Sequence, residues 1–380
     1  MTKRLLMLLV ASLVLVVACA PSPGATSPKA PAPTAGVTAT QKEAWQIEWD
    51  KTVQAARAEG KLTIYGDLSV DESQAIIKNM AAQYGVTVEL VAGKAAEIAQ
   101  KTLSERNAGL FIPDINMSGV VGSIVLLKPR GVTEKMDTAL ILPDVKNPAI
   151  WLNGVFPWVD SDHTQIQFIG EVFPGILVNT QAVPPGEIKS YQDLLNPKWK
   201  GKMVLADPTT PSSGSQWFSK MTLVLGEDYM RSIVKQAPVI SRNDRLSVEW
   251  VAQNKYPVGV ALQSAQIWKF IAEGAPVAVV DTEVGALSPG HGCISLMKNA
   301  PHPNAAKVFI NWMLTKEGQT AFSKGAFSAS RRTDVETSWV APAAVPKAGR
   351  KYIEDDDASL AKRNDMADLA KVIFEPLLKG

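Results

Sequence analysis

The sequence predicts two α/β domains that follow an export signal and a flexible linker. Strand-like and helix-like segments alternate with short connections between residues 61 and 118. A second series of the same kind runs from residue 170 to residue 281, and an amphipathic helix pair follows at 301–323. Such alternation is typical of α/β domains with largely parallel sheets.

The first 18 residues have the pattern of a secretory signal. Lys3 and Arg4 precede an apolar run from Leu5 to Ala18. The run is shorter than the roughly 20 residues that a membrane-spanning helix needs, which favours an export signal over a permanent anchor.

Cys19 stands where this apolar run ends. Residues 16–19 resemble the bacterial lipobox, in which the signal is cut before a cysteine that then carries lipid. Residues 20–40 contain five prolines, six alanines and no aromatic residue, so they predict a flexible spacer. We therefore expect residues 19–40 to be a lipid-anchored linker. The alternative is an ordinary signal peptide cleaved at Ala18 or Ala20.

The net charge and the cysteine content exclude some classes of protein. Lys3 and Arg4 account for the formal charge of +2, so the chain becomes neutral once the signal is removed. Nucleic acid is then an unsuitable partner, because phosphate binding needs a concentrated basic surface. With Cys19 expected to carry lipid, Cys293 has no cysteine left to pair with, which excludes a disulfide framework. About 340 residues remain from Lys42 onward, enough for two domains.

The first domain begins with a helix over 41–59 that Gly60 can end, followed by a buried strand over 61–66. Ser69 and Glu72 have capping-box spacing and predict the start of a helix that stops at Gly85. A strand over 86–93, a helix over about 94–108 and a strand over 110–118 complete the series. Short connections predict parallel pairing with right-handed crossovers.

The second domain begins near 170–180. Strands are predicted over 202–207 and 257–262, with helices between them. The segment 276–281 is predicted to be the strand that leaves this domain.

Ligands of open α/β sheets bind beyond the carboxyl ends of the strands. We therefore expect ligand-binding residues among residues 65–67, residues 116–119 and residues 207–215. Residues 207–218 carry hydroxyl groups and a glycine ahead of a helical stretch, and the free N–H groups of a helix start suit an anion. The alternative is that Ser212 or Ser213 only caps the helix.

The sequence shows no established catalytic motif. The histidines, His163, His291 and His302, have no metal-ligand companions at usable spacing. Neither a Gly-x-Ser-x-Gly motif nor a phosphate loop is present. Cys293 with His291 is the one pair that an exported enzyme could use. We expect no catalytic residue, metal centre or cofactor.

Four segments carry a resemblance to a known family: 59–66, 196–208, 288–319 and 328–335. The chain resembles the extracellular solute-binding lipoproteins of bacterial ABC importers, in the branch grouped with ferric-ion-binding proteins. The resemblance implies a type II periplasmic-binding-protein-like fold, with two α/β lobes joined by crossing strands. It implies a first lobe of 41–168 plus 283–335 and a second of 169–282. It assigns residues 336–380 to neither lobe.

The resemblance also implies partners and a location. The solute would be a small molecule held between the lobes, and the partners would be an ABC permease and its ATPase subunit. The protein would be a monomer, exported to the periplasm or cell surface and held at the membrane by lipid on Cys19. An adhesive or scaffold lipoprotein without a small ligand is a third interpretation.

Ferric binders of this family commonly use adjacent tyrosines late in the second lobe. The matching region, 260–270, has no tyrosine and offers Gln263, Ser264 and Gln266 instead. These neutral groups are poor ligands for Fe³⁺, so a small anion or organic acid is favoured. A ferric ion or iron complex is the alternative.

The expected site draws on both lobes. Tyr65 would line the cleft, Asp67 would accept hydrogen bonds from a cationic part of the solute, and Ser118 would add a hydroxyl. In the second lobe we expect an acidic group to be held by Thr210, Ser212, Ser213 and Gly214, with Arg242 as countercharge. The alternative for Arg242 is a solvated surface position. Trp158, Trp217 and Trp268 are expected in the core or as an aromatic wall of the cleft.

Overall fold

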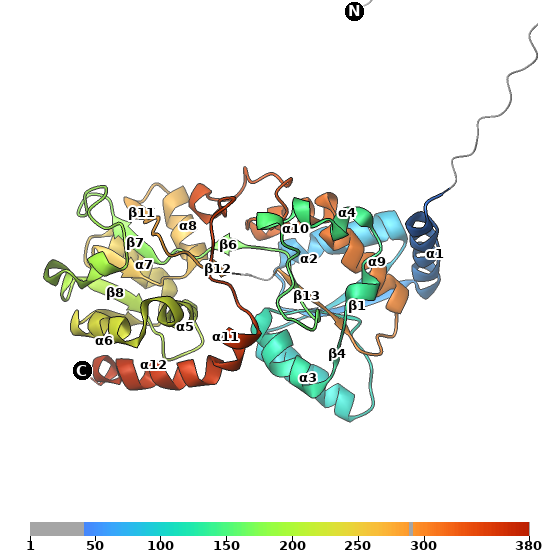
Figure 1. Ribbon diagram of the computed structural model, residues 1–380, viewed down its shortest axis with the longest axis horizontal. Helices are drawn as coiled ribbons and strands as arrows, with labels where there is room; N and C mark the ends of the chain where they lie inside the picture. The colour runs from blue at the N-terminus through green and yellow to red at the C-terminus, as the bar shows by residue number, and fades with distance from the viewer. Residues whose placement is uncertain (1–41, 289–291, 380) are drawn as a thin grey trace, which may run out of the picture. The chain divides into compact units, whose positions relative to one another are not determined.

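The computed structural model describes residues 42–288 and 292–379 (Figure 1). The predicted signal peptide, Cys19 and the linker lie outside these residues, and so does His291. Within the described ranges, no helix combines the length and the apolar character that crossing a membrane requires.

The first sheet is built around β1, whose Leu62 and Ile64 are fully buried. β2 and β3 pair with β1 in parallel, as the sequence predicts, whereas β13 runs antiparallel to β3, β4 and β5. In spatial order the strands are β2 (Thr87–Ala92), β1 (Lys61–Gly66), β3 (Ile115–Met117), β13 (Cys293–Met297) and β4 (Thr133–Glu134), with β5 (Ile166–Gln167) beside β13.

Local signals set the helices of this region, which we call lobe 1. Ser69 and Glu72 form the predicted capping box at the start of α2, and Gly60 ends α1 with a φ of 69°. α1 packs on α9, and α2 packs on α10 (Figure 1). The helices are α1 (Ala44–Glu59), α2 (Val70–Asn79), α3 (Ala95–Asn107), α4 (Pro143–Lys146), α9 (Pro303–Leu314) and α10 (Lys316–Ala326), with the wider turn η2 (Val121–Leu127).

The second sheet and its helices form lobe 2. β8 pairs in parallel with β9 and β10, and β7 lies antiparallel between β10 and β11. The order is β11 (Val277–Val279), β7 (Ile176–Asn179), β10 (Val258–Val260), β8 (Met203–Ala206) and β9 (Val239–Ser241). The helices are α5 (Ser213–Leu225), α6 (Glu227–Lys235), α7 (Asp244–Ala252) and α8 (Ser264–Ala272).

The chain passes between the sheets through a short antiparallel pair, β6 (Glu171–Val172) and β12 (Leu287–Ser288). The expectation that 276–281 leaves the second domain is wrong in one respect. β11 remains in the second sheet as its edge strand, and β12 makes the crossing pair. The exact lobe boundaries stay a prediction.

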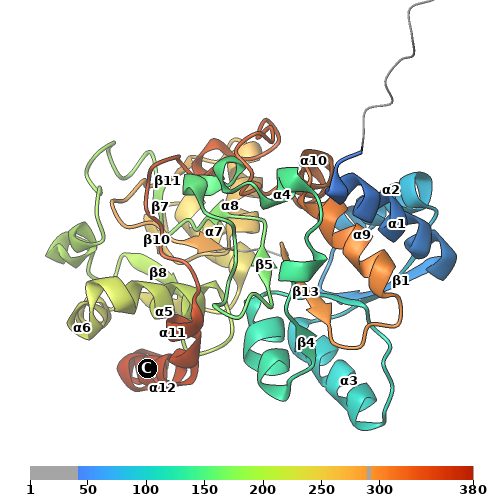
Figure 2. The same cartoon turned by 45° about the vertical axis from the view of Figure 1, so that its right-hand side comes forward.

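Residues after 336, which the sequence does not place, join both groups of elements. Ile353 bridges Ala286 next to β12, and the short helix α11 (Asp357–Ala361) follows. α12 (Arg363–Leu378) then packs on α5 and α6, with Phe374 edge-on to Phe218 at 5.9 Å. Figures 1 and 2 both show α12 beside these helices.

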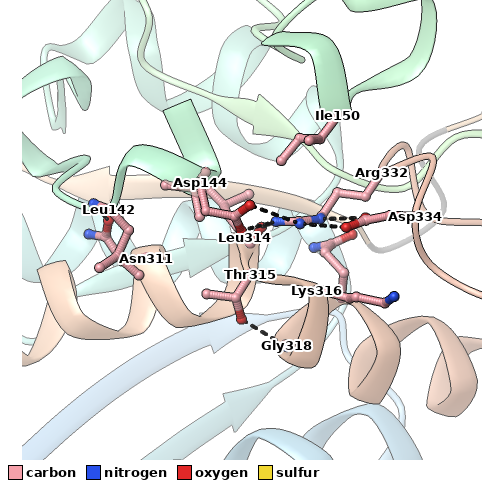
Figure 3. A network of polar contacts seen from close by, with 12 residues as sticks. Leu142, Asp144, Ile150, Asn311, Leu314, Thr315, Lys316, Gly318, Arg332 and Asp334 are labelled. Atoms are coloured by element: carbon pink, nitrogen blue, oxygen red, sulfur yellow. Dashed lines mark hydrogen bonds and ion pairs between the residues drawn. The ribbon is translucent and has the colours of Figure 1, made fainter. Parts of the chain in front are cut away.

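Arg332 fastens the segment after α10 to lobe 1 (Figure 3). Its guanidinium is almost fully buried, and it donates to the carboxylate of Asp144 at 2.8 Å and to both carboxylate oxygens of Asp334 at 2.9 Å. It also donates to the carbonyl oxygen of Leu314 at 2.9 Å. A buried cation is tolerated when its donors are satisfied in this way.

Replacing Arg332 with Ala should therefore lower the free energy of unfolding by about 2–3 kcal/mol, because a buried carbonyl loses its donor and a cavity opens. Urea unfolding measures the loss. The exposed pair between Arg231 and Glu227 supplies the control, and Arg231→Ala should cost less than about 0.5 kcal/mol. Equal effects of the two substitutions would contradict an anchoring role for Arg332.

Candidate functional site

A pocket of about 490 Å³ is lined by residues of both lobes and of the C-terminal segment. Lobe 1 contributes Asp67 and residues 119–121, and the crossing strands contribute Glu171 and Ser288. Lobe 2 contributes residues 208–211 of the loop before α5 and several residues of α5 between Ser213 and Leu223, together with Gln263 and Ser264. The volume suits a small organic solute.

Asp207 organises the loop between β8 and α5. Its Oδ1 accepts hydrogen bonds from the backbone N–H of Thr209 at 2.8 Å and from the Thr209 hydroxyl at 2.6 Å. Its Oδ2 lies 2.6 Å from Nε of Arg242, and its carbonyl oxygen accepts from the Ser212 hydroxyl at 2.6 Å. The loop is therefore held from its first residue to the cap of α5.

These contacts decide the ionisation of Asp207. Burial opposes the charged form, but the hydrogen bonds from Thr209 and the guanidinium of Arg242 outweigh burial and lower the pKa of the carboxyl. Asp207 is thus an ionised support beneath the pocket wall, and it is not itself a lining residue.

Gly214 lets α5 begin against the end of β8. A Cβ at this position would lie 2.2 Å from the carbonyl oxygen of Ala206 and 2.6 Å from that of Asp207. No side chain fits there without moving the backbone. Ser213, the residue before it, is thereby placed at the pocket wall.

Two helices of lobe 2 begin at the pocket. Thr210 and Ser213 line it next to the start of α5, while Gln263 and Ser264 line it at the start of α8. The Ser213 hydroxyl oxygen is buried without a hydrogen-bond partner in the described part of the chain. The N-terminal ends of helices favour negative charge, so this wall is suited to an acidic group.

A second wall, formed by lobe 1, the crossing strands and the C-terminal segment, carries carboxylates. Asp67 follows β1, and Glu171 accepts hydrogen bonds from the indole N–H of Trp268 at 2.8 Å and from the Ser328 hydroxyl at 3.2 Å. Asp355 lies 2.9 Å from the ammonium nitrogen of Lys220 on α5. Acceptors on this side can receive hydroxyl or ammonium donors of a solute.

The predicted site residues fall into three groups. Asp67, Thr210 and Ser213 line the pocket. Ser212 caps α5, accepting from the backbone N–H of Ser215 at 3.3 Å, and Gly214 acts through close packing; neither lines the pocket.

The other three predicted residues lie away from the lining. The Tyr65 hydroxyl donates to Glu105 on α3 at 3.0 Å, and Ser118 is fully buried near η2. The Arg242 side chain is 67% exposed and contacts Asp207. Ligand contact by any of these residues stays a prediction.

The three tryptophans considered for the cleft pack within the lobes or support a neighbour, and none of them is a lining residue. Trp217 is buried in the lobe 2 core, Trp158 stacks on His163 at 4.3 Å, and Trp268 supports Glu171. Phe173 and Phe218 are the aromatic residues that line the pocket in the described ranges.

Sequence reasoning missed several lining residues. Lys220 lies seven positions after Ser213, which places both on one face of α5, so helical spacing could have found it. Glu171 belongs to a two-residue strand that gives little pattern. Asp355, Ser359 and Arg363 belong to the segment for which the sequence offered no place.

Metal and thiol chemistry find little support in the described residues. These contain no group of three or more histidine, cysteine or carboxylate side chains placed to hold a metal ion, and no tyrosine among them lines the pocket. Cys293 is fully buried, which raises the pKa of its thiol and disfavours the reactive thiolate.

Gly214→Ala should displace the start of α5 and lower the free energy of unfolding by about 2–3 kcal/mol, because the new methyl group meets two backbone carbonyl oxygens. Thermal or urea unfolding measures this. Ser213→Ala, one residue earlier, introduces no such contact and should leave stability within about 0.5 kcal/mol. A Gly214→Ala variant as stable as the parent would refute the close approach.

Asp207→Asn should destabilise the protein by about 1–2 kcal/mol at pH 7. Because folding lowers the pKa of Asp207, the ionised carboxylate stabilises the fold at neutral pH, and this contribution disappears as the pH falls below about 4. Urea unfolding should show the difference between variant and parent shrinking at pH 3. Asp368→Asn, which alters an exposed pair, is the control and should show almost no difference at either pH. A pH-independent gap for Asp207→Asn would contradict the account.

Known proteins share this architecture. A family model described as bacterial extracellular solute-binding protein matches residues 73–328. Iron uptake protein A1 of Synechocystis sp. is 20% identical over 285 residues, which is 70% of this chain and 74% of that protein. The Trichodesmium protein IdiA (FutA), solved in complex with iron and citrate, gives a TM-score of 0.66 at 19% identity, covering 83% of this chain and 99% of its own.

A further solved relative holds a different ligand. The periplasmic binding protein AfuA of Actinobacillus pleuropneumoniae, solved with fructose 6-phosphate, gives a TM-score of 0.56 at 21% identity and covers 84% of this chain and 98% of its own. At such identities the likeness establishes the fold, which is the type II periplasmic binding fold, and leaves the ligand open.

Members of this family are periplasmic proteins that bind solutes and deliver them to ABC permeases. The matched family model spans more than half of the chain, and the solved neighbours include ferric-binding and AfuA-type proteins. The chain therefore belongs to the bacterial extracellular solute-binding proteins, in the branch of ABC-importer receptors that resembles ferric-binding proteins.

Proposed function

We propose that this protein captures a small organic acid, phosphorylated or carboxylated, in the pocket between its lobes and delivers it to an ABC permease. The observation that carries the proposal is the lobe 2 wall, where α5 and α8 both begin and where the Ser213 hydroxyl lacks a partner among the described residues. An acidic group placed there receives backbone N–H and hydroxyl donors.

The second wall restricts the rest of the solute. Asp67 and Glu171 offer carboxylate acceptors, so the solute carries hydroxyl or ammonium donors at its other end. A hydroxylated phosphate ester or an amino-bearing acid satisfies both walls. A solute that contacts both walls shifts the balance between open and closed lobes, because binding energy is then available only in the closed form.

Bare ferric ion is the alternative. Iron is named for several solved neighbours, and Asp67, Glu171 and Asp355 supply hard oxygen donors to the pocket. The described lining residues offer no phenolate, however, and Asp355 is already engaged by Lys220. The organic acid therefore fits the present donor set better.

The protein is proposed to act without chemistry of its own and to be tethered by lipid on Cys19. Buried Cys293 supports the first part, since a thiol with a raised pKa is a poor nucleophile. The order of signal, cysteine and proline-rich spacer supports the second. Loss of membrane association in a Cys19→Ser variant, measured by fractionation, tests the tether.

A ligand screen tests the proposed function. Fructose 6-phosphate, phosphonates, sulfonates, citrate, polyamines, thiamine and Fe³⁺ alone are offered to the protein in a thermal-shift assay. A true ligand at a hundred times its Kd adds about 2.7 kcal/mol to the stability of the folded state. We expect a phosphorylated or carboxylated compound to raise the Tm. Stabilisation by Fe³⁺ alone, with no response to any acid, would refute the proposal.

Thr210 and Ser213 provide the matched variants. Ser213→Ala and Thr210→Ala should each weaken binding of the acid found in the screen about five- to tenfold by isothermal titration, because each removes one hydroxyl donor. Ser232→Ala, whose hydroxyl bonds within α6, should leave the affinity unchanged. Unchanged affinity in both pocket variants would place the acid elsewhere.

A further inference from the structure

The C-terminal segment 354–363 lies outside the part of the chain that the family model matches, 73–328. It nevertheless supplies Asp355, Ser359, Leu360 and Arg363 to the pocket lining. The pocket therefore has a wall that family membership does not explain.

This segment is attached to lobe 1. The carboxylate oxygen Oδ2 of Asp357 accepts hydrogen bonds from the backbone N–H of Ser161 at 2.8 Å and from its hydroxyl at 2.7 Å. Leu360 is buried in a small apolar cluster with Val120, Ile124 and Cys293. α11 is thus held beside η2, whose start also lines the pocket.

The same segment is attached to lobe 2. Asp355 pairs with Lys220, which is itself more than nine-tenths buried. Ala370, Ile373 and Phe374 of α12 are buried in the core of lobe 2. Arg363 precedes Ala370 by seven residues and Phe374 by eleven, so it belongs to the inward face of α12. Met366 and Ala367, one turn further along, also line the pocket.

Arg363 differs from the other cation of the lining. Lys220 donates to the carbonyl oxygen of Leu287 at 3.0 Å and to Asp355 at 2.9 Å. Arg363 is half-buried, and the described residues give it no hydrogen bond and no ion pair within contact distance. Burial lowers the pKa of its guanidinium, and the more distant charge of Asp355 opposes this effect. A half-buried guanidinium at the pocket wall without a protein partner is available to pair with a bound anion.

We propose that Arg363 is a ligand-binding residue, which reaches the pocket from the C-terminal segment and pairs its guanidinium with the acidic group of the solute. The inference rests on the proposed function, since it needs an acidic solute. It adds a charged donor to the hydroxyls of Thr210 and Ser213, and it makes the segment 354–363 part of the specificity of the site. An arginine fork favours planar or tetrahedral oxyanions over neutral solutes of the same size.

Arg363→Gln tests the assignment in the full mature chain. Fructose 6-phosphate and citrate are the probes. In isothermal titration, the affinity of the variant for the probe that the parent binds should be at least tenfold lower than that of the parent. Arg363→Lys keeps the charge and loses the fork, so its affinity should fall between those of parent and Gln variant. Lys362→Gln removes the same charge from the exposed neighbouring residue and should leave affinity within twofold.

The outcomes separate the two proposals. Parent-like affinity in Arg363→Gln overturns the role of Arg363 while the proposed function stands. A parent protein that binds neither these probes nor any other acid overturns both. Thermal unfolding without ligand excludes misfolding, because removing a half-buried charge that has no partner should leave the Tm equal to that of the parent or raise it. If Lys362→Gln lost as much affinity as Arg363→Gln, the loss would follow from the lower net charge alone. That result would contradict a direct contact between Arg363 and the solute.

Discussion

The candidate site depends on the ionised carboxylate of Asp207. This buried group holds Thr209 and Arg242, while the backbone carbonyl of the same residue accepts from the cap of α5, and together they fix the loop from which Thr210 and Ser213 reach the pocket. Gly214 adds a second restriction, because only a residue without Cβ lets α5 start against the end of β8. The wall is therefore rigid before any solute arrives, which spares binding part of its ordering cost.

The sequence predicted those features of the fold that local interactions decide. Gly60, Gly85 and the capping box of Ser69 and Glu72 act within a few residues, and the structure has the helix ends where these residues predict them. The resemblance to solute-binding proteins was confirmed at the level of family and fold. Arg332 could not be assigned a role, because its partners Asp144 and Leu314 lie far from it in the sequence.

The lining of the candidate site was predicted only in part, again because the sequence reports local interactions and not tertiary packing. Proximity to strand ends located Asp67, Thr210 and Ser213 at the pocket, but it does not decide which way a side chain faces. Tyr65 shows this, since it is the last residue but one of β1 yet its hydroxyl bonds to Glu105 on α3. Arg363 and Asp355 were out of reach, because their position follows from the packing of α12 on lobe 2 and of α11 on lobe 1. Only tertiary structure brings that segment to the pocket.

The central claim is that lobe 2 and the C-terminal segment together hold the acidic end of a solute. A crystal structure of the protein with bound fructose 6-phosphate, or with the acid that the ligand screen identifies, tests it most directly. The account predicts the acidic oxygens within hydrogen-bond distance of the start of α5 and of the Arg363 guanidinium. Acidic oxygens placed against Asp67 and Glu171 instead, or a metal ion bound there without any acid, would contradict it.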